Sequence, residues 1–304
     1  KKYKIKTKYR LRAGGYGKYN GITAIDCEEI IRENSAISEN EMQRLRSIHW
    51  LIWFGWNHNF LKPLWKFAHK KFQVNPVDIV LFLSDINKVK IDEWKKLLKN
   101  FEKESSNEWF DSREDLAAYY EKSDFLEDKE FDHFLKSEFK YNAKVLLNKS
   151  IFGSMVDLSI EVIKTLSTLK KDDNYWSNVK KCMIETVCFP EDIMNNKIQE
   201  AKIIEVDADF YKYFANLNNH ITSSAKQKFF KVKLYKNQND LSHIQKTMIE
   251  NHYEKDKIRA VVKTLGSNSN AYSYKTTTNL NELEAKDLTV TFNNDDGMVH
   301  HKFN

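Results

Sequence analysis

The chain has 304 residues, which is long enough to bury a sizeable core without disulfides or metal ions. It contains only 8 glycines and 3 prolines, which excludes collagen-like and linker-like chains and argues against a turn-rich β-sandwich. The net charge is +6, but all the charged residues that precede Asp26 are basic, so the remainder of the chain carries a net charge of −2. Most of the molecule therefore lacks a general basic field that would attract nucleic acid.

The N-terminal segment is predicted to begin with a strand. Charged and uncharged side chains alternate along residues 4–12, which on a strand places five cations on one face. These cations are Lys4, Lys6, Lys8, Arg10 and Arg12. Two interpretations stay open: lysines that protect an edge strand from aggregation, and a face that contacts a phosphate-bearing cofactor, substrate or RNA. The glycine-rich residues 14–21 are predicted to form a turn or loop, and residues 24–32 a second strand.

A helix is predicted to begin at about residue 39. Ser38 and Glu41 have the spacing of a capping box, and apolar residues then recur at intervals of three and four up to Trp56. The apolar arc is wide, so we expect this helix to lie between two neighbours. Its polar side chains would need partners if buried, and they are our candidates for substrate contact. These candidates are Arg46, His49, Asn57 and His58.

Helical patterns recur along most of the remaining chain and change only beyond Pro190. Further helices are predicted over 60–72, 77–87, 91–101, 112–121, 131–139, 142–169 and 172–188. After Pro190 we expect strands at 203–206 and 229–235, helices at 208–217 and 239–252, and a short strand at 288–292. The predicted fold is mainly α, a helical bundle-like array with a short N-terminal β element and a small α+β module toward the C-terminus.

This pattern predicts four parts of the chain. Residues 1–37 would hold the strands and glycine loop, 38–189 a helical domain, 190–266 the α+β module, and 267–304 a polar, mobile tail. No segment is long and apolar enough for a membrane span, which needs about 20 residues. Cys27, Cys182 and Cys188 form no CxxC pair and leave an odd thiol, so we expect a reducing, cytoplasmic setting.

The sequence offers no catalytic or metal-binding motif. His49, His58 and His69 are too far apart along a helix to form a metal-binding pair. Cys182 and Cys188 are expected to be buried as small hydrophobic residues. No serine or cysteine lies in a recognisable nucleophile motif, so we assign no catalytic residue and no metal ligand.

The order of several short motifs resembles a known family. These motifs are residues 7–11 with 16–19, residues 28–31, Ser38 through residues 46–49 to 56–57, residues 112–116 with 119–120, residues 139–142, and more weakly residues 232–235 with Gln238. In this order they resemble the region that follows the catalytic barrel in cobalamin-binding radical S-adenosylmethionine enzymes. The resemblance covers most of residues 3–250, but each motif is a loose pattern.

The resemblance implies a function and several partners. Such enzymes hold a [4Fe-4S] cluster and S-adenosylmethionine through a CxxxCxxC loop, and this chain has no such loop. We therefore expect an accessory C-terminal region that caps the barrel and shapes the substrate cavity, binds no cofactor by itself and is inactive alone. We also expect that Lys1, which is not a methionine, follows missing cobalamin-binding and barrel domains.

The whole enzyme would bind cobalamin, the cluster and S-adenosylmethionine. It would perform radical methyl transfer or a related modification on a small-molecule or lipid substrate. The alternative function is a helical binding module that docks RNA or another polyanion through the basic N-terminal strand. Nucleic acid is the less favoured partner because lysine lacks the bidentate fork with which arginine reads phosphate and guanine.

Overall fold

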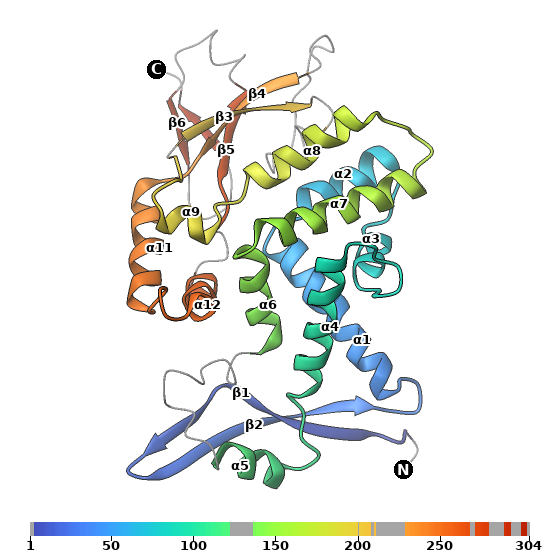
Figure 1. Ribbon diagram of the computed structural model, residues 1–304, viewed down its shortest axis with the longest axis vertical. Helices are drawn as coiled ribbons and strands as arrows, with labels where there is room; N and C mark the ends of the chain where they lie inside the picture. The colour runs from blue at the N-terminus through green and yellow to red at the C-terminus, as the bar shows by residue number, and fades with distance from the viewer. Residues whose placement is uncertain are drawn as a thin grey trace.

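The structure is a computed structural model. It describes residues 3–121, 136–199, 201–207, 210, 229–267, 271–279, 289–292 and 299–302. The predicted fold class is confirmed: the described residues form a mainly helical molecule with a two-stranded N-terminal sheet and a small sheet in the C-terminal region (Figure 1). The N-terminal sheet lies at one end of the helical body and the small sheet at the other.

The N-terminal sheet is an antiparallel ribbon of β1 (Lys6–Tyr19) and β2 (Ile22–Glu33). The turn is not formed by the glycine-rich segment as a whole, which corrects the predicted loop over 14–21. Strand β1 continues through most of that segment, and the chain reverses at Asn20 and Gly21, where φ is +50° and +81°. An Asn-Gly pair tolerates positive φ, which is why the hairpin turns at this position.

The helical body begins with α1 (Glu39–Ile52). Both hydrogen bonds of the Ser38–Glu41 capping box are present, which confirms the predicted start. The helix then continues as a π-helical turn, η1 (Trp53–Asn57). The next helices are α2 (Lys62–Phe72), α3 (Pro76–Leu83), α4 (Asp92–Ser106) and α5 (Arg113–Glu121).

The long helix predicted over 142–169 is two helices. They are α6 (Ser137–Leu146) and α7 (Lys149–Leu166). The Asn148 side chain accepts hydrogen bonds from the backbone N–H groups of Ser150 and Ile151, so it caps a new helix instead of continuing the old one. Asp172 caps α8 (Asp173–Glu185) in the same way, and α9 (Pro190–Met194) follows.

The C-terminal module is built on a sheet with the order β3-β4-β5. These strands are β3 (Ala201–Asp207), β4 (Phe229–Tyr235) and β5 (Lys275–Asn279). Between β4 and β5 lie α11 (Gln238–Glu250) and α12 (Lys257–Ser267), and the hairpin of β6 (Thr289–Phe292) and β7 (Val299–Lys302) follows. The helix predicted over 208–217 lies outside the described residues except for Phe210.

Part of the segment predicted to be a mobile tail is packed. Strand β5 pairs with β4, and Tyr272 is fully buried, although its flanking sequence is rich in Ser, Thr and Asn. The buried ammonium of Lys236 donates to the carbonyl oxygens of Ala271 and Ser273 at 2.7 and 3.2 Å. These hydrogen bonds and the burial of the tyrosine explain why residues 271–279 are ordered against the core.

One hydrophobic core extends through the helical body into the C-terminal module. It includes Trp50, Trp94, Phe152, Val206 and Tyr272, all fully buried. A separate, smaller core lies between the ribbon and α5 and contains Leu11, Leu116 and Tyr120. In the part of the chain that the structure describes, no helix could cross a bilayer.

Candidate functional site

The ribbon packs on both of its faces. It lies between α5 on one side and the helical body on the other (Figure 1). Side chains alternate along a strand, so Tyr9 and Leu11 face α5, while Arg10 and Arg32 face Trp109 in the segment between α4 and α5. The ribbon is therefore fixed in orientation, although an isolated two-stranded hairpin has only marginal stability in water.

A charged cluster, here called the Trp109 cluster, fills the space between the ribbon and the helices. Three guanidinium groups surround the indole ring, with their central carbons 4.8, 4.3 and 5.3 Å from its centroid. They belong to Arg10, Arg32 and Arg46, and three carboxylates complete the cluster: Glu28, Glu108 and Glu138. Its cations and anions are equal in number, so the Trp109 cluster is neutral overall.

Arg46 is the centre of the Trp109 cluster. Its Nε and Nη2 donate to the carboxylate of Glu138 at 3.0 and 2.9 Å. Nη2 also donates to Glu108 at 2.6 Å, and Nη1 donates to the carbonyl of Ser105 at 2.8 Å. Burial alone would lower the pKa of this guanidinium, but the two carboxylates raise it on balance. The structure thus places this predicted substrate contact in an internal network.

Glu28 joins the second strand to the start of α6. It accepts hydrogen bonds from Arg10 and from the ammonium of Lys136, the latter at 2.8 Å. Partial burial would raise the pKa of the Glu28 carboxyl, but these two cations hold it below its usual value. Glu108 similarly accepts from the backbone N–H of Ser137 at 2.6 Å. The cluster therefore joins segments that are about a hundred residues apart in the chain.

Arg32 is the least well paired guanidinium in the cluster. It is 4% exposed, and its Nη2 donates to Gln43 at 3.0 Å. Its closest ionic contact in the described chain is Glu39 at 3.9 Å, and its Nε has no hydrogen-bond partner there. Burial is the main reason that the pKa of this group is lowered. Stacking on Trp109 compensates for part of this cost.

The structure pairs four of the five cations proposed as an anion-binding face. Lys6 binds Glu33 at 2.7 Å, and Lys8 binds Glu39 and Asp111 at 3.1 and 3.3 Å. Arg10 lies in the Trp109 cluster, and exposed Arg12 binds Asp26 at 3.3 Å. Lys4 precedes the strand, with φ at +48°. The strand therefore presents neither a free basic face nor a bare edge, because Lys8 and Arg10 point toward acidic residues of the protein, Glu39 and Glu28.

The other proposed substrate contacts do not converge with Arg46. His49 and Asn57 are exposed on α1 and η1, whereas His58 is buried at 7% exposure. The His58 ring packs on Trp53 with centroids 4.9 Å apart. The four residues therefore do not form one binding site. Sequence inspection also missed Trp109 and Glu108, since a loop tryptophan beside an acid gives no periodic signal.

The cysteines have separate environments. Burial raises the pKa of Cys182 and of Cys188 to about 12, so both remain thiols at neutral pH, as expected for buried hydrophobic residues. Cys27 lies on the ribbon, where Arg113 Nε donates to its sulfur at 3.2 Å. No group of three or more His, Cys, Asp and Glu side chains that could hold a metal occurs among the described residues.

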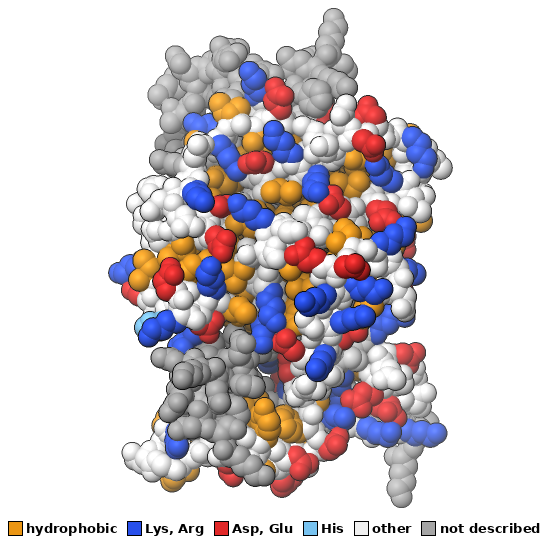
Figure 2. Space-filling view, viewed as in Figure 1, with side chains coloured by type: hydrophobic (Ala, Val, Ile, Leu, Met, Phe, Trp, Pro, Cys, Tyr) orange, Lys and Arg blue, Asp and Glu red, His pale blue; other side chains and the backbone are white. Residues whose placement is uncertain are grey.

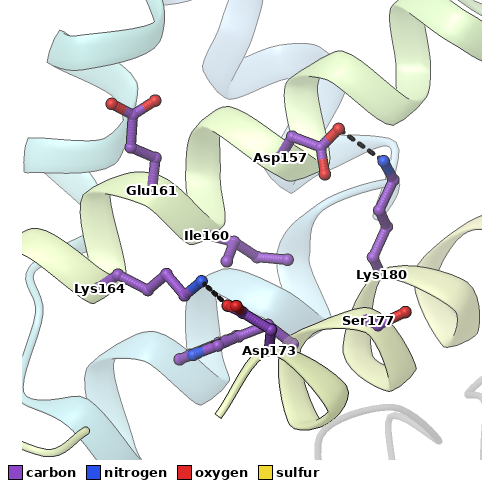
Figure 3. Close-up of a pocket in the computed structure, with 8 residues that line it drawn as sticks. Asp157, Ile160, Glu161, Lys164, Asp173, Ser177 and Lys180 are labelled. Atoms are coloured by element: carbon purple, nitrogen blue, oxygen red, sulfur yellow. Dashed lines mark hydrogen bonds and ion pairs between the residues drawn. The ribbon is translucent and has the colours of Figure 1, made fainter. Parts of the chain in front are cut away.

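A groove of about 390 Å³ lies between α7 and α8 (Figure 3). Two ion pairs line it, Lys180 with Asp157 at 2.6 Å and Lys164 with Asp173 at 2.7 Å, and Ile160 lies between them. The hydrogen bond from Lys164 lowers the pKa of Asp173. These four charged groups neutralise one another, and Glu161, which also lines the groove, pairs with Lys90 at 3.4 Å.

The visible surface of the helical body carries interspersed basic and acidic side chains (Figure 2). This mixture agrees with the near-zero charge of the chain beyond its first residues. Comparison with protein-family models and with curated proteins finds no match to this chain. The Trp109 cluster, which holds the ribbon against the helices, is therefore the strongest candidate site that the structure itself provides.

Proposed function

We propose that this chain is the accessory C-terminal region of a cobalamin-dependent radical S-adenosylmethionine enzyme, where it caps the barrel and shapes the substrate cavity. In the whole enzyme the reaction would be radical methyl transfer or a related modification of a small-molecule or lipid substrate. In this proposal the cofactors are held outside this chain, and the ribbon end is the platform that faces the rest of the enzyme.

One observation carries the proposal: most of the motifs behind the resemblance meet at the ribbon end. Arg10 of the first motif pairs with Glu28 of the second. Tyr120 of a later motif packs with Leu11 in the small core. Arg46 of the third motif joins the Trp109 cluster, where its Nη2 donates to Glu108 at 2.6 Å. Motifs spread over more than a hundred residues therefore support one local structure, as a shared platform would require.

The ribbon is suited to a fixed platform. The Trp109 cluster holds one face, and the core with α5 holds the other. The edge of β1 is joined at one point, where Tyr9 and Phe110 exchange backbone hydrogen bonds of 2.9 and 2.8 Å. Such clamping lowers the entropy that the ribbon would lose on meeting another domain.

The thiols of this chain do not fit an iron–sulfur cluster. A cluster needs thiolates, and two of the three cysteines are buried thiols whose pKa is raised to about 12. This observation supports the proposal that the iron–sulfur cluster and S-adenosylmethionine are bound outside this chain. The chain's own contribution would then be to position helices and ribbon around a cavity.

The coding sequence upstream of Lys1 provides the decisive test. The proposal requires a CxxxCxxC loop upstream, followed by enough chain to complete a barrel. An initiating methionine close to Lys1, or an upstream region without that loop, would contradict it.

Anaerobic reconstitution gives an independent test on the chain itself. Residues 1–304 incubated with iron, sulfide and cobalamin should retain neither a stoichiometric cluster nor corrin absorbance after gel filtration. The longer protein treated in the same way should retain both. Stoichiometric cluster binding by the shorter chain would show that the chemistry lies within it.

A further inference from the structure

Helix α2 carries a basic face that is separate from the ribbon. This helix contains four lysines and one histidine and no acidic residue. Lys62, Lys66 and Lys70 are four residues apart, and His69 is adjacent, so all four share one face of the helix. We call this face the α2 lysine stripe. Lys62 and Lys66 are half-buried, and His69 and Lys70 are exposed.

The α2 lysine stripe lacks an acidic partner among the residues that the structure describes. In the part of the chain that the structure describes, Lys62, Lys66 and Lys70 make no ion pair, in contrast to Lys6, Lys8 and many other lysines. The Lys62 ammonium lies 5.4 Å from the centroid of the Trp56 ring. Burial, and then the charge of Lys66, lower the pKa of Lys62. The three lysines of the stripe therefore lie together without an ion-pair partner among the described residues.

Helix stability does not account for this placement. Cations are favourable in the last turn of a helix, where His69 and Lys70 lie. Lys62, however, is the first residue of α2, where the helix dipole disfavours a cation, and neither an acidic residue nor a side-chain cap accompanies it. The contact of Lys62 with Trp56 offsets part of this cost, and a local cost that is only partly offset is typical of a functional surface.

We propose that the α2 lysine stripe docks the chain on an anionic lipid surface. The stripe consists of lysines on one helix face, and lysine is a compact point charge suited to diffuse headgroup charge. Exposed apolar side chains precede and follow α2 in the chain, Ile52 at 39% and Val77 at 55%. Single-stranded nucleic acid would instead favour a groove with free aromatic faces, and Lys62 already occupies the Trp56 ring.

The expected affinity is modest and depends on salt. Each lysine near an anionic membrane contributes about a 5-fold gain in binding, so the three lysines together contribute roughly 100-fold. This contribution should weaken as ionic strength rises, because the Debye length falls from about 10 Å at 0.1 M salt to about 3 Å at 1 M.

Vesicle co-sedimentation tests the proposal. The chain should bind phosphatidylcholine vesicles that contain phosphatidylserine and should not bind pure phosphatidylcholine vesicles. The triple substitution K62Q/K66Q/K70Q should lower the affinity by about 100-fold. The matched control K96Q/K99Q/K103Q removes the same charge from exposed, unpaired lysines of α4, whose sequence also contains four acidic residues, and should change binding by less than about 3-fold.

Three results would overturn the proposal. The first is equal binding of the wild-type chain to both kinds of vesicle, and the second is an equal loss in the two triple variants. The third is loss of polyuridylate binding in the α2 variant with vesicle binding intact, which would assign the stripe to RNA. Far-ultraviolet circular dichroism and thermal melts of both variants exclude unfolding as the cause. These results do not depend on the upstream sequence, so this proposal and the proposed function can fail separately.

Discussion

The Trp109 cluster and the α2 lysine stripe are both rich in cations, but they differ in what surrounds these cations. In the cluster, carboxylates from three different segments reach three guanidinium groups. On α2, the helix itself contains no acidic residue, and Lys62, Lys66 and Lys70 make no ion pair with any described residue. The first arrangement joins distant parts of the fold, whereas the second leaves its charge available to an outside partner.

Removal of Arg46 from the Trp109 cluster should change the free energy of unfolding more than any other substitution considered for the two regions. The R46A substitution leaves Glu108 and Glu138 without their main cation in a largely buried position, so the free energy of unfolding should fall by about 3–5 kcal/mol. Urea denaturation followed by tryptophan fluorescence measures the loss. R12A breaks an exposed ion pair on the same strand and should cost less than about 1 kcal/mol. Similar losses in both variants would show that the cluster has no special role.

A methyl group at Gly15 should distort the ribbon that carries half of the cluster. A Cβ there would collide with the carbonyl oxygen of Asp26 and approach that of Arg12 to 2.9 Å, and neither backbone atom can move easily. The G15A substitution should therefore cost about 1–3 kcal/mol. The G21A substitution provides a contrast, because a Cβ at residue 21 would meet no atom within 4 Å, whereas the φ of +81° disfavours a side chain there. Full wild-type stability in G15A would contradict the close packing of β1 on β2.

The pH dependence should reveal the pairing of Glu28. The pKa of its carboxyl is lower in the folded chain than the ordinary value of 4.5, so the unfolded chain binds more protons between these two values. Its contribution to stability is complete above about pH 4.5 and is lost as the pH falls through the folded pKa. Urea midpoints between pH 7 and pH 3 should fall less steeply in E28Q than in the wild type, and parallel curves would contradict the prediction.

The smallest expected effect is a gain in stability, in contrast to the losses predicted for the Trp109 cluster and the ribbon. K62Q removes a cation that the helix dipole and the charge of Lys66 disfavour, but it also removes the contact with the Trp56 ring, so it should raise the free energy of unfolding by at most about 0.5 kcal/mol. K70Q removes a cation from the last turn, where the dipole favours it, and should lower stability by a similar amount. Thermal melts at low salt measure both, and a loss of stability in K62Q would remove the argument that the stripe is costly.

Much of the helical architecture could be predicted from local sequence. The capping box at Ser38 located the start of α1, and strand β4 has the predicted bounds, Phe229–Tyr235. Helix α12 was not predicted, although Asp256 provides a start signal: its side chain accepts from the N–H of Arg259 at 2.9 Å. The split between α6 and α7 was missed because apolar residues continue across Asn148, whose cap competes with helix continuation.

The candidate site was only partly predictable. Arg46 was singled out as a side chain that needs partners if buried, and the structure buries it with partners 62 and 92 residues away. His49, Asn57 and His58 have the same kind of local sequence context, yet two are exposed and one packs on an aromatic ring. Sequence spacing indicates which residues share a helix face, but it does not indicate what lies opposite that face.

The sequence by itself determined the helix-rich fold class and the basic character of the N-terminal segment, since periodicity, caps and charge counts are local properties. Only the tertiary structure decided which cations are neutralised. It turned Lys8 and Arg10 of the basic strand toward Glu28, Glu39 and Glu108, and it left Lys62, Lys66 and Lys70 of α2 without an ion pair in the described chain. The physical reason is that an ion pair depends on a few ångströms of separation, and packing sets that separation between segments far apart in the chain.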